Sequence, residues 1–145
     1  MAERGARQRV LFLCTHNSAR SQMAEGLLRH LAGDRFEVVS AGTEATFVRP
    51  EAIEAMAELG VDISAQSSKT LERYLGEPFD HVVTVCDDAN EACPVFPRAK
   101  SRLHWSFRDP SRSEGSAEER LEDFRTVRDE IQGRIRRELI GGSRR

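Results

Sequence analysis

The sequence predicts an α/β fold of three layers (α/β/α), in which helices cover both faces of a four-stranded parallel sheet. Short apolar runs alternate along the chain with segments whose apolar residues recur at helical spacing. The run at 81–85 is apolar or β-branched at nearly every position, as in a strand that is covered on both faces. A length of 145 residues suits one core. We therefore expect a single domain over residues 1–145 with its core at about 9–139.

The first half of the chain reads as strand, helix, strand and helix. Residues 10–13 form an apolar run that predicts a buried strand, and a helical pattern begins at Ser21 and ends at Gly33. The second strand is predicted at 36–40. Apolar residues at helical spacing predict the next helix at 51–59.

The second half of the chain supplies two more strands and the longest helix. A short helix is expected at 70–75, and strands are expected at 81–85 and 102–105. A long amphipathic helix at 117–139 ends the fold. Its buried stripe is predicted to contain Leu121, Phe124, Val127, Ile131, Ile135 and Leu139.

Composition excludes several classes of partner. The formal net charge is −2, and acidic and basic residues are mixed along the chain, so we expect neither nucleic-acid nor membrane binding. No apolar stretch approaches the length of a membrane span or of a secretory signal, which predicts a cytoplasmic protein. In a reducing compartment the three cysteines indicate thiol chemistry, since a structural disulfide framework does not form there.

The loop between the first strand and the first helix carries a cysteine and an arginine in a C-x5-R pattern. A helix N-terminus and the backbone N–H groups before it favour an oxyanion and the ionised form of a cysteine at their centre. We expect Cys14 to be a nucleophile, Arg20 to clamp two anion oxygens and Ser21 to donate to the thiolate. The alternative is a buried cysteine beside a surface arginine. The oxyanion-binding residues are predicted to be Thr15, His16, Asn17, Ser18, Ala19 and Arg20.

The second cysteine, Cys86, directly follows the predicted strand at 81–85. The carboxyl ends of parallel strands meet at one edge of a sheet, so Cys14 and Cys86 could share one crevice. A simply buried cysteine at a strand end is the alternative.

The third cysteine, Cys93, lies seven residues after Cys86. In a helix their Cα atoms would be about 10.5 Å apart, and a disulfide needs them within about 7 Å. A bond between them therefore requires the polar segment to loop or unwind. A redox switch uses all three thiols. We predict no metal site, because the cysteine spacings do not match a zinc clip.

Together these motifs resemble the thioredoxin-coupled arsenate reductases, which share the fold of the low-molecular-weight protein tyrosine phosphatases. The likeness runs from about Arg9 to Leu139. The C-x5-R-S loop fits either group, whereas the pair of later cysteines with His-Trp-x-Phe-x-Asp-Pro is specific to the reductases. The matching segments are 14–26, 40–42, 83–86, 93–94, 104–110 and 127–131.

The resemblance implies a three-thiol relay. Cys14 would attack arsenate, for which phosphate and sulfate are analogues, while Asp109 protonates the departing oxygen. Cys86 would then attack Cys14 and release arsenite, and Cys93 would attack Cys86 to move the disulfide outward. Thioredoxin would reduce that disulfide, so the resemblance implies no bound cofactor. We expect a monomer.

This chain departs from the family's pattern at three positions. Ala19 replaces a further cysteine that lies outside the relay, and His16 stands where glycine is frequent. Some relatives bind a monovalent cation through residues that match Asn17, Glu25 and Ser40 together with an aspartate, where this chain has Lys69. We expect the ammonium group of Lys69 to replace the ion and predict no potassium dependence.

Three other functions remain open at this point. A phosphatase that hydrolyses phosphomonoesters through a cysteinyl-phosphate needs Cys14, Arg20 and Asp109, but neither later cysteine. Ser111 follows Asp109-Pro110 where tyrosine phosphatases commonly have an aromatic residue, which disfavours this reading. The others are a non-catalytic thiol sensor or arsenite-binding protein, and a reductase that uses a small external thiol.

Overall fold

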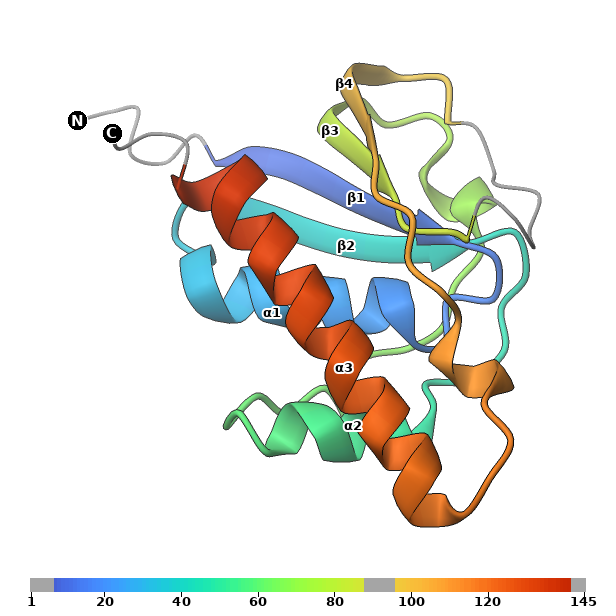
Figure 1. Cartoon of the computed structure of the whole chain (residues 1–145). Helices are drawn as coiled ribbons and strands as arrows, with labels where there is room; N and C mark the ends of the chain where they lie inside the picture. Colours follow the sequence, from blue (N-terminus) through green and yellow to red (C-terminus); the bar gives the residue numbers. More distant parts are fainter. Residues whose placement is uncertain (1–6, 88–95, 142–145) are drawn as a thin grey trace.

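The sheet of the described residues contains four parallel strands, as predicted, and the structure shows their order to be β2-β1-β3-β4. The computed structural model describes residues 7–87 and 96–141 (Figure 1). β1 and β3 are the two inner strands, so both cysteine-bearing strand ends lie in the middle of the sheet. The strands are β1 Gln8–Cys14, β2 Phe36–Gly42, β3 Phe79–Thr84 and β4 Ala99–His104.

The edge strand β4 differs most from its prediction. It begins at Ala99, three residues before the predicted start, and its burial alternates along its length. An edge strand with one covered face does not show a continuous apolar run, so the prediction at 102–105 found only the last residues of β4. β3 begins earlier and ends at Thr84, although the Val85 amide still donates to the Leu13 carbonyl at 2.9 Å.

Three helices lie on one face of the sheet (Figure 1). α1 (Arg20–Ala32) packs on β1 and β2, and α3 (Ala117–Ile135) packs against both α1 and α2 (Pro50–Ala57). The core of this face includes Val10, Phe12, Cys14, Met23, Leu27, Val83, Cys86, Trp105 and Phe124.

The opposite face has a thinner cover among the described residues. The predicted short helix is the 3-10 turn η2, Leu71–Tyr74. Leu71 and Tyr74 pack on a second core cluster, in which Phe79 makes edge-on ring contacts with Tyr74 and Phe96. The three layers are therefore the helices, the sheet and this short turn with its neighbours.

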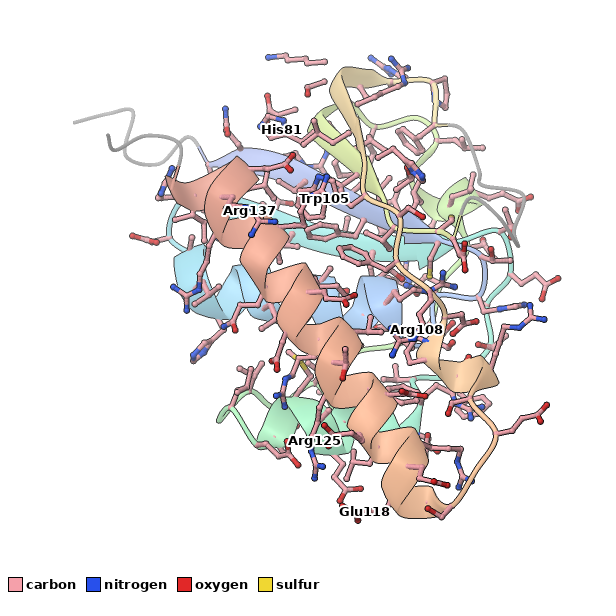
Figure 2. All side chains as sticks on the ribbon, in the orientation of Figure 1. His81, Trp105, Arg108, Glu118, Arg125 and Arg137 are labelled. Atoms are coloured by element: carbon pink, nitrogen blue, oxygen red, sulfur yellow. The ribbon has the colours of Figure 1, made fainter. Side chains whose placement is uncertain are left out.

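The long helix α3 buries the predicted stripe. Five of the six predicted residues are buried, and Leu139 is partly buried beyond the end of α3, where the chain continues as one π-helical turn. Ser116 caps the helix and forms a capping box with Glu119. Figure 2 shows Arg125 on the side of α3 that faces α2, and Trp105 beside the far end of α3. No helix of the described residues is long and apolar enough to cross a membrane.

Candidate oxyanion-binding thiol site

The loop of residues 15–19 joins the end of β1 to the first residue of α1. Cys14 is the last residue of β1 and is 2% exposed, and Arg20 opens α1. The Sγ atom of Cys14 lies 2.9 Å from Oγ of Ser21. Both side chains therefore sit at the N-terminus of a helix, where the helix dipole favours negative charge.

The hydrogen-bond network fixes which way the Ser21 hydroxyl points. The Lys69 backbone amide can only donate, and it donates to Oδ1 of Asn17 at 2.8 Å. Nδ2 of Asn17 is therefore the donor, and it donates to Ser21 Oγ at 2.8 Å and to Ser40 Oγ at 3.0 Å. Ser21 accepts from Asn17, so its own hydrogen is available for the Cys14 sulfur, which favours the thiolate.

The backbone of the loop is held from outside. The carbonyls of Thr15, His16 and Ser18 accept hydrogen bonds from residues 43–49 and from Ser68. The carbonyl and the amide of a trans peptide point in opposite directions. The N–H group that follows each of these carbonyls therefore points away from the residues that donate to the carbonyl. Such a row of N–H groups forms a concave anion-binding nest.

Two backbone features accommodate this tight loop. Asn17 adopts a positive φ of 50°, which asparagine tolerates better than most residues. Gly42 passes so close to the loop that a Cβ atom there would lie 2.6 Å from the Thr15 carbonyl oxygen and 2.9 Å from the Asn17 nitrogen. Any side chain at position 42 would displace the loop.

Arg20 and Asp109 meet beside the loop. The Arg20 side chain is 2% exposed, and its Nη2 lies 3.5 Å from Oδ2 of Asp109, which is also nearly buried. Arg20 Nη1 donates to the Phe107 carbonyl at 3.2 Å. The other Asp109 oxygen accepts from the amide and hydroxyl of Ser111 at 3.0 and 2.6 Å. The carboxyl group is thus anchored at one oxygen, while the other lies beside the guanidinium.

The structure places Cys86 at the same edge of the sheet as Cys14. Leu13 pairs with Thr84, so the chain after Thr84 emerges level with Cys14. Cys86 is fully buried, and both thiols belong to the same core cluster. Cys93 lies outside the described residues. Within 7–87 and 96–141, no group of three His, Cys, Asp or Glu residues could hold a metal ion.

The residues that match the cation site of some relatives are engaged with protein donors. Oδ1 of Asn17 accepts from the Gln22 side chain and from the Lys69 amide, and Glu25 accepts from Ser40 and Arg29. The Lys69 ammonium group donates to the Ser67 carbonyl. Burial lowers the pKa of Lys69, an effect that the nearby carboxylate of Glu25 opposes. The oxygen atoms that could bind a cation already accept hydrogen bonds, and the Lys69 ammonium group adds a positive charge near Glu25. These residues therefore do not fit an added cation.

Two glutamines that hold Asn17 were not predicted from the sequence. Gln22 is fully buried in α1, and its Nε2 donates to Asn17 Oδ1 at 2.9 Å. Gln66 in turn donates to Oε1 of Gln22 at 2.8 Å. A polar residue at a buried helical position was the available signal for Gln22. Gln66 lies in an irregular segment 44 residues away, where no pattern marks it.

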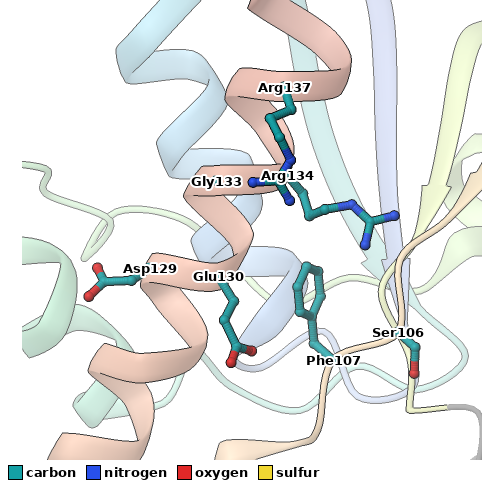
Figure 3. Close-up of a pocket in the computed structure, with 7 residues that line it drawn as sticks. All are labelled: Ser106, Phe107, Asp129, Glu130, Gly133, Arg134 and Arg137. Carbon is teal, nitrogen blue, oxygen red and sulfur yellow. The ribbon is translucent and has the colours of Figure 1, made fainter.

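A pocket of about 370 Å³ lies elsewhere, between α3 and the segment that follows β4 (Figure 3). Phe107, Glu130 and Arg134 are among its lining residues, and Cys14 is not. Phe107 links this pocket to the Cys14 loop, because its carbonyl accepts a hydrogen bond from Arg20.

Comparison with known proteins relates this geometry to a family. Residues 9–140 match the low molecular weight phosphotyrosine protein phosphatase family. The chain is 50% identical over 127 residues to a Halalkalibacterium halodurans protein named arsenate reductase, covering 88% of this chain and 91% of that one. A solved structure of an arsenate reductase in the phosphate binding state has a TM-score of 0.79 and 35% identity, and the match covers 93% of this chain and 98% of that chain.

A further solved structure is the thioredoxin-dependent arsenate reductase of Corynebacterium glutamicum. Its TM-score is 0.62 and its identity 33%, and the match covers 90% of this chain and 62% of that chain. The fold described above is therefore shared over nearly the whole length of this chain.

Proposed function

We propose that this protein, which belongs to the low molecular weight phosphotyrosine protein phosphatase family and within it to the arsenate reductases, reduces arsenate to arsenite. The observation that carries the proposal is the placement of two buried thiols at one edge of the sheet: Cys14 ends β1, Cys86 follows the adjacent strand β3, and the loop after Cys14 leads to the buried Arg20, which pairs with Asp109. A phosphatase has no use for the second thiol.

The first step uses the Cys14 loop. The loop amides and Arg20 hold the oxyanion, and the Cys14 thiolate attacks its arsenic atom. Asp109 gives a proton to the departing oxygen, which leaves as water, and a covalent thiol-arsenate adduct results. The anchoring of Asp109 by Ser111 supports this role, because it holds the carboxyl group next to Arg20.

The second step transfers two electrons to arsenic. The Cys86 thiolate attacks the sulfur of Cys14, and the electron pair of the sulfur–arsenic bond passes to arsenic, which leaves as arsenite. Cys93 then attacks Cys86, so that the Cys14 thiolate is released and a disulfide between Cys86 and Cys93 remains. An external dithiol, thioredoxin, reduces this disulfide and completes the cycle. The relay needs no bound cofactor.

The setting of the reaction follows from its chemistry. A thiol relay must be returned to the reduced state, so we propose that it operates in the cytoplasm. One chain carries all three cysteines of the relay, and we propose that the enzyme is a single domain that works as a monomer.

The test follows NADPH oxidation in the presence of arsenate, thioredoxin and thioredoxin reductase. We expect turnover by the native protein and none by Cys14→Ser, Cys86→Ser or Cys93→Ser. Ser106→Ala is the matched control, because Ser106 is exposed and lies outside the relay. If only Cys14→Ser were inactive, the relay would be wrong. Hydrolysis of para-nitrophenyl phosphate by both later variants would then favour the phosphatase.

A further inference from the structure

Arg29 joins two chains of hydrogen bonds that both end on Asn17. It lies one helical turn after Glu25 in α1 and is 47% exposed at its side chain. Its Nη2 donates to Glu25 Oε2 and to the Val38 carbonyl, both at 2.6 Å, and its Nη1 donates to Gln66 Oε1 at 3.2 Å. One guanidinium therefore connects α1, β2 and the segment before η2.

The first chain runs through the carboxylate. Glu25 Oε1 accepts from Ser40 Oγ at 2.6 Å, and Ser40 Oγ accepts from Asn17 Nδ2 at 3.0 Å. The Glu25 side chain is only 7% exposed, so its charge depends on protein partners. Arg29 is the cation that contacts it directly.

The second chain runs through the two glutamines. Gln66 Nε2 donates to Gln22 Oε1 at 2.8 Å, and Gln22 Nε2 donates to Asn17 Oδ1 at 2.9 Å. Main-chain carbonyls fix these directions, because the same two amide nitrogens also donate to the Gln22 and Ser67 carbonyls. Every hydrogen in this chain therefore points from Arg29 toward Asn17.

We propose that Arg29 is a positioning residue for the nucleophile: it closes this ring, orients the Asn17 carboxamide, and through Ser21 favours the ionised form of the Cys14 thiol. The inference rests on the proposed function in one respect only, since it concerns the same nucleophile. The hydrogen bonds of Arg29 go to Glu25, Val38 and Gln66, all of which lie outside the loop of residues 15–19.

Two physical effects of Arg29 act in the same direction. A positive charge at the start of a chain of aligned donors polarises each following hydrogen bond, so Asn17 becomes a better donor to Ser21. Without Arg29, the buried Glu25 carboxylate would lose its direct cationic partner, and its negative charge would oppose a second negative charge on sulfur. Lys69 lies within electrostatic range of Glu25 and makes the loss partial.

The test measures the ionisation of Cys14 without arsenate. In a Cys86→Ser, Cys93→Ser background, Cys14 is the only thiol, and its rate of alkylation by iodoacetamide is followed against pH. The variants are Arg29→Met, which keeps the apolar stem, and Gln66→Met, which cuts only the second chain. The other charged or titratable groups around the loop and ring stay unchanged; they include Arg20, Asp109, His16, Glu44, Lys69 and Arg73.

Arg125→Met is the matched control. This substitution also removes an arginine from its carboxylate partners, Glu58 and Glu122. Arg125 lies at the contact between α2 and α3 and is not part of the ring (Figure 2). We expect Arg29→Met to raise the alkylation midpoint by about 0.5–1 pH unit, a three- to tenfold loss of thiolate below the midpoint. We expect a smaller rise in Gln66→Met and none in Arg125→Met.

Equal midpoints in all variants would overturn the proposal, as would a similar rise in Arg125→Met. Either result would make Arg29 a residue that only stabilises the fold. Because alkylation needs neither arsenate nor thioredoxin, a native protein without reductase activity would refute the proposed function and leave this result intact.

Discussion

At the scale of single residues, one carboxamide organises the site. Asn17 has a positive φ, and its side chain accepts from Lys69 and Gln22 and donates to Ser21 and Ser40. Replacing it would remove the left-handed preference and four hydrogen bonds together. The Lys69 amide, which cannot accept, and Gln22 Nε2, which also donates to a main-chain carbonyl, make the direction of this network unambiguous.

Lys69 predicts that the protein does not depend on potassium ions. The acceptor oxygens of Asn17 and Glu25 are engaged with protein donors, and the Lys69 ammonium group adds a positive charge beside them. We expect equal turnover and equal melting temperature in potassium and sodium chloride at matched ionic strength. Thermal unfolding and the NADPH assay check this. A rise with potassium alone would contradict it.

At the scale of elements, Arg128 joins α3 to the end of α2. Its Nη1 donates to the Ala55 carbonyl at 2.8 Å and to Glu58 at 2.9 Å. The first of these satisfies a carbonyl in the last turn of α2, which has no partner within the helix. Helical periodicity counts an arginine as part of the exposed face, so this contact was invisible in the sequence.

We expect Arg128→Met to destabilise the protein by about 1–3 kcal/mol, because a buried carbonyl loses its donor. The midpoint of urea unfolding measures the change. Arg136→Met is the control, since Arg136 is exposed just beyond the end of α3. A similar loss in both variants would mean that Arg128 does not act through the end of α2.

The contact between Arg128 of α3 and Glu58 at the end of α2 is sensitive to pH. Hydrogen bonds from Arg125 and then Arg128 hold the pKa of Glu58 below its ordinary value of 4.5. A carboxyl group with a lowered pKa stabilises the fold above its unfolded pKa, and this contribution is lost as the pH falls through the folded pKa. We expect Glu58→Gln to unfold at lower urea than the native protein at neutral pH. The difference should close below about pH 4.5, and a difference that persisted there would contradict the assignment.

At the scale of the whole molecule, the sheet order brings distant thiols to one edge. Cys14 and Cys86 are separated by a long stretch of sequence, yet β1 and β3 are hydrogen-bonded neighbours. Trp105 lies in the same core, 6.1 Å from the Phe12 ring and 6.5 Å from the Phe107 ring. It reports on the packing of α3 and β4 around the site.

The single-domain prediction can be tested with this residue, which is the only tryptophan of the chain. If the chain is one cooperative unit, Trp105 emission and far-ultraviolet circular dichroism should change at the same urea concentration. An emission change at lower urea than the loss of helix would show that the Trp105 region unfolds as a separate unit.

The amino-acid sequence alone predicted the main helices and strands along the chain and marked the C-x5-R loop as the candidate site. Buried strands, an amphipathic helix and a C-x5-R loop are local patterns, because burial on a regular element imposes its period on neighbouring residues. Tertiary structure alone decided the extent of β4, the single-sided packing of the three helices and the ring from Arg29 to Asn17. These depend on contacts between segments far apart in the chain. A hydrogen bond between Gln66 and Gln22 leaves no periodic trace in either segment, so only the folded chain reveals it.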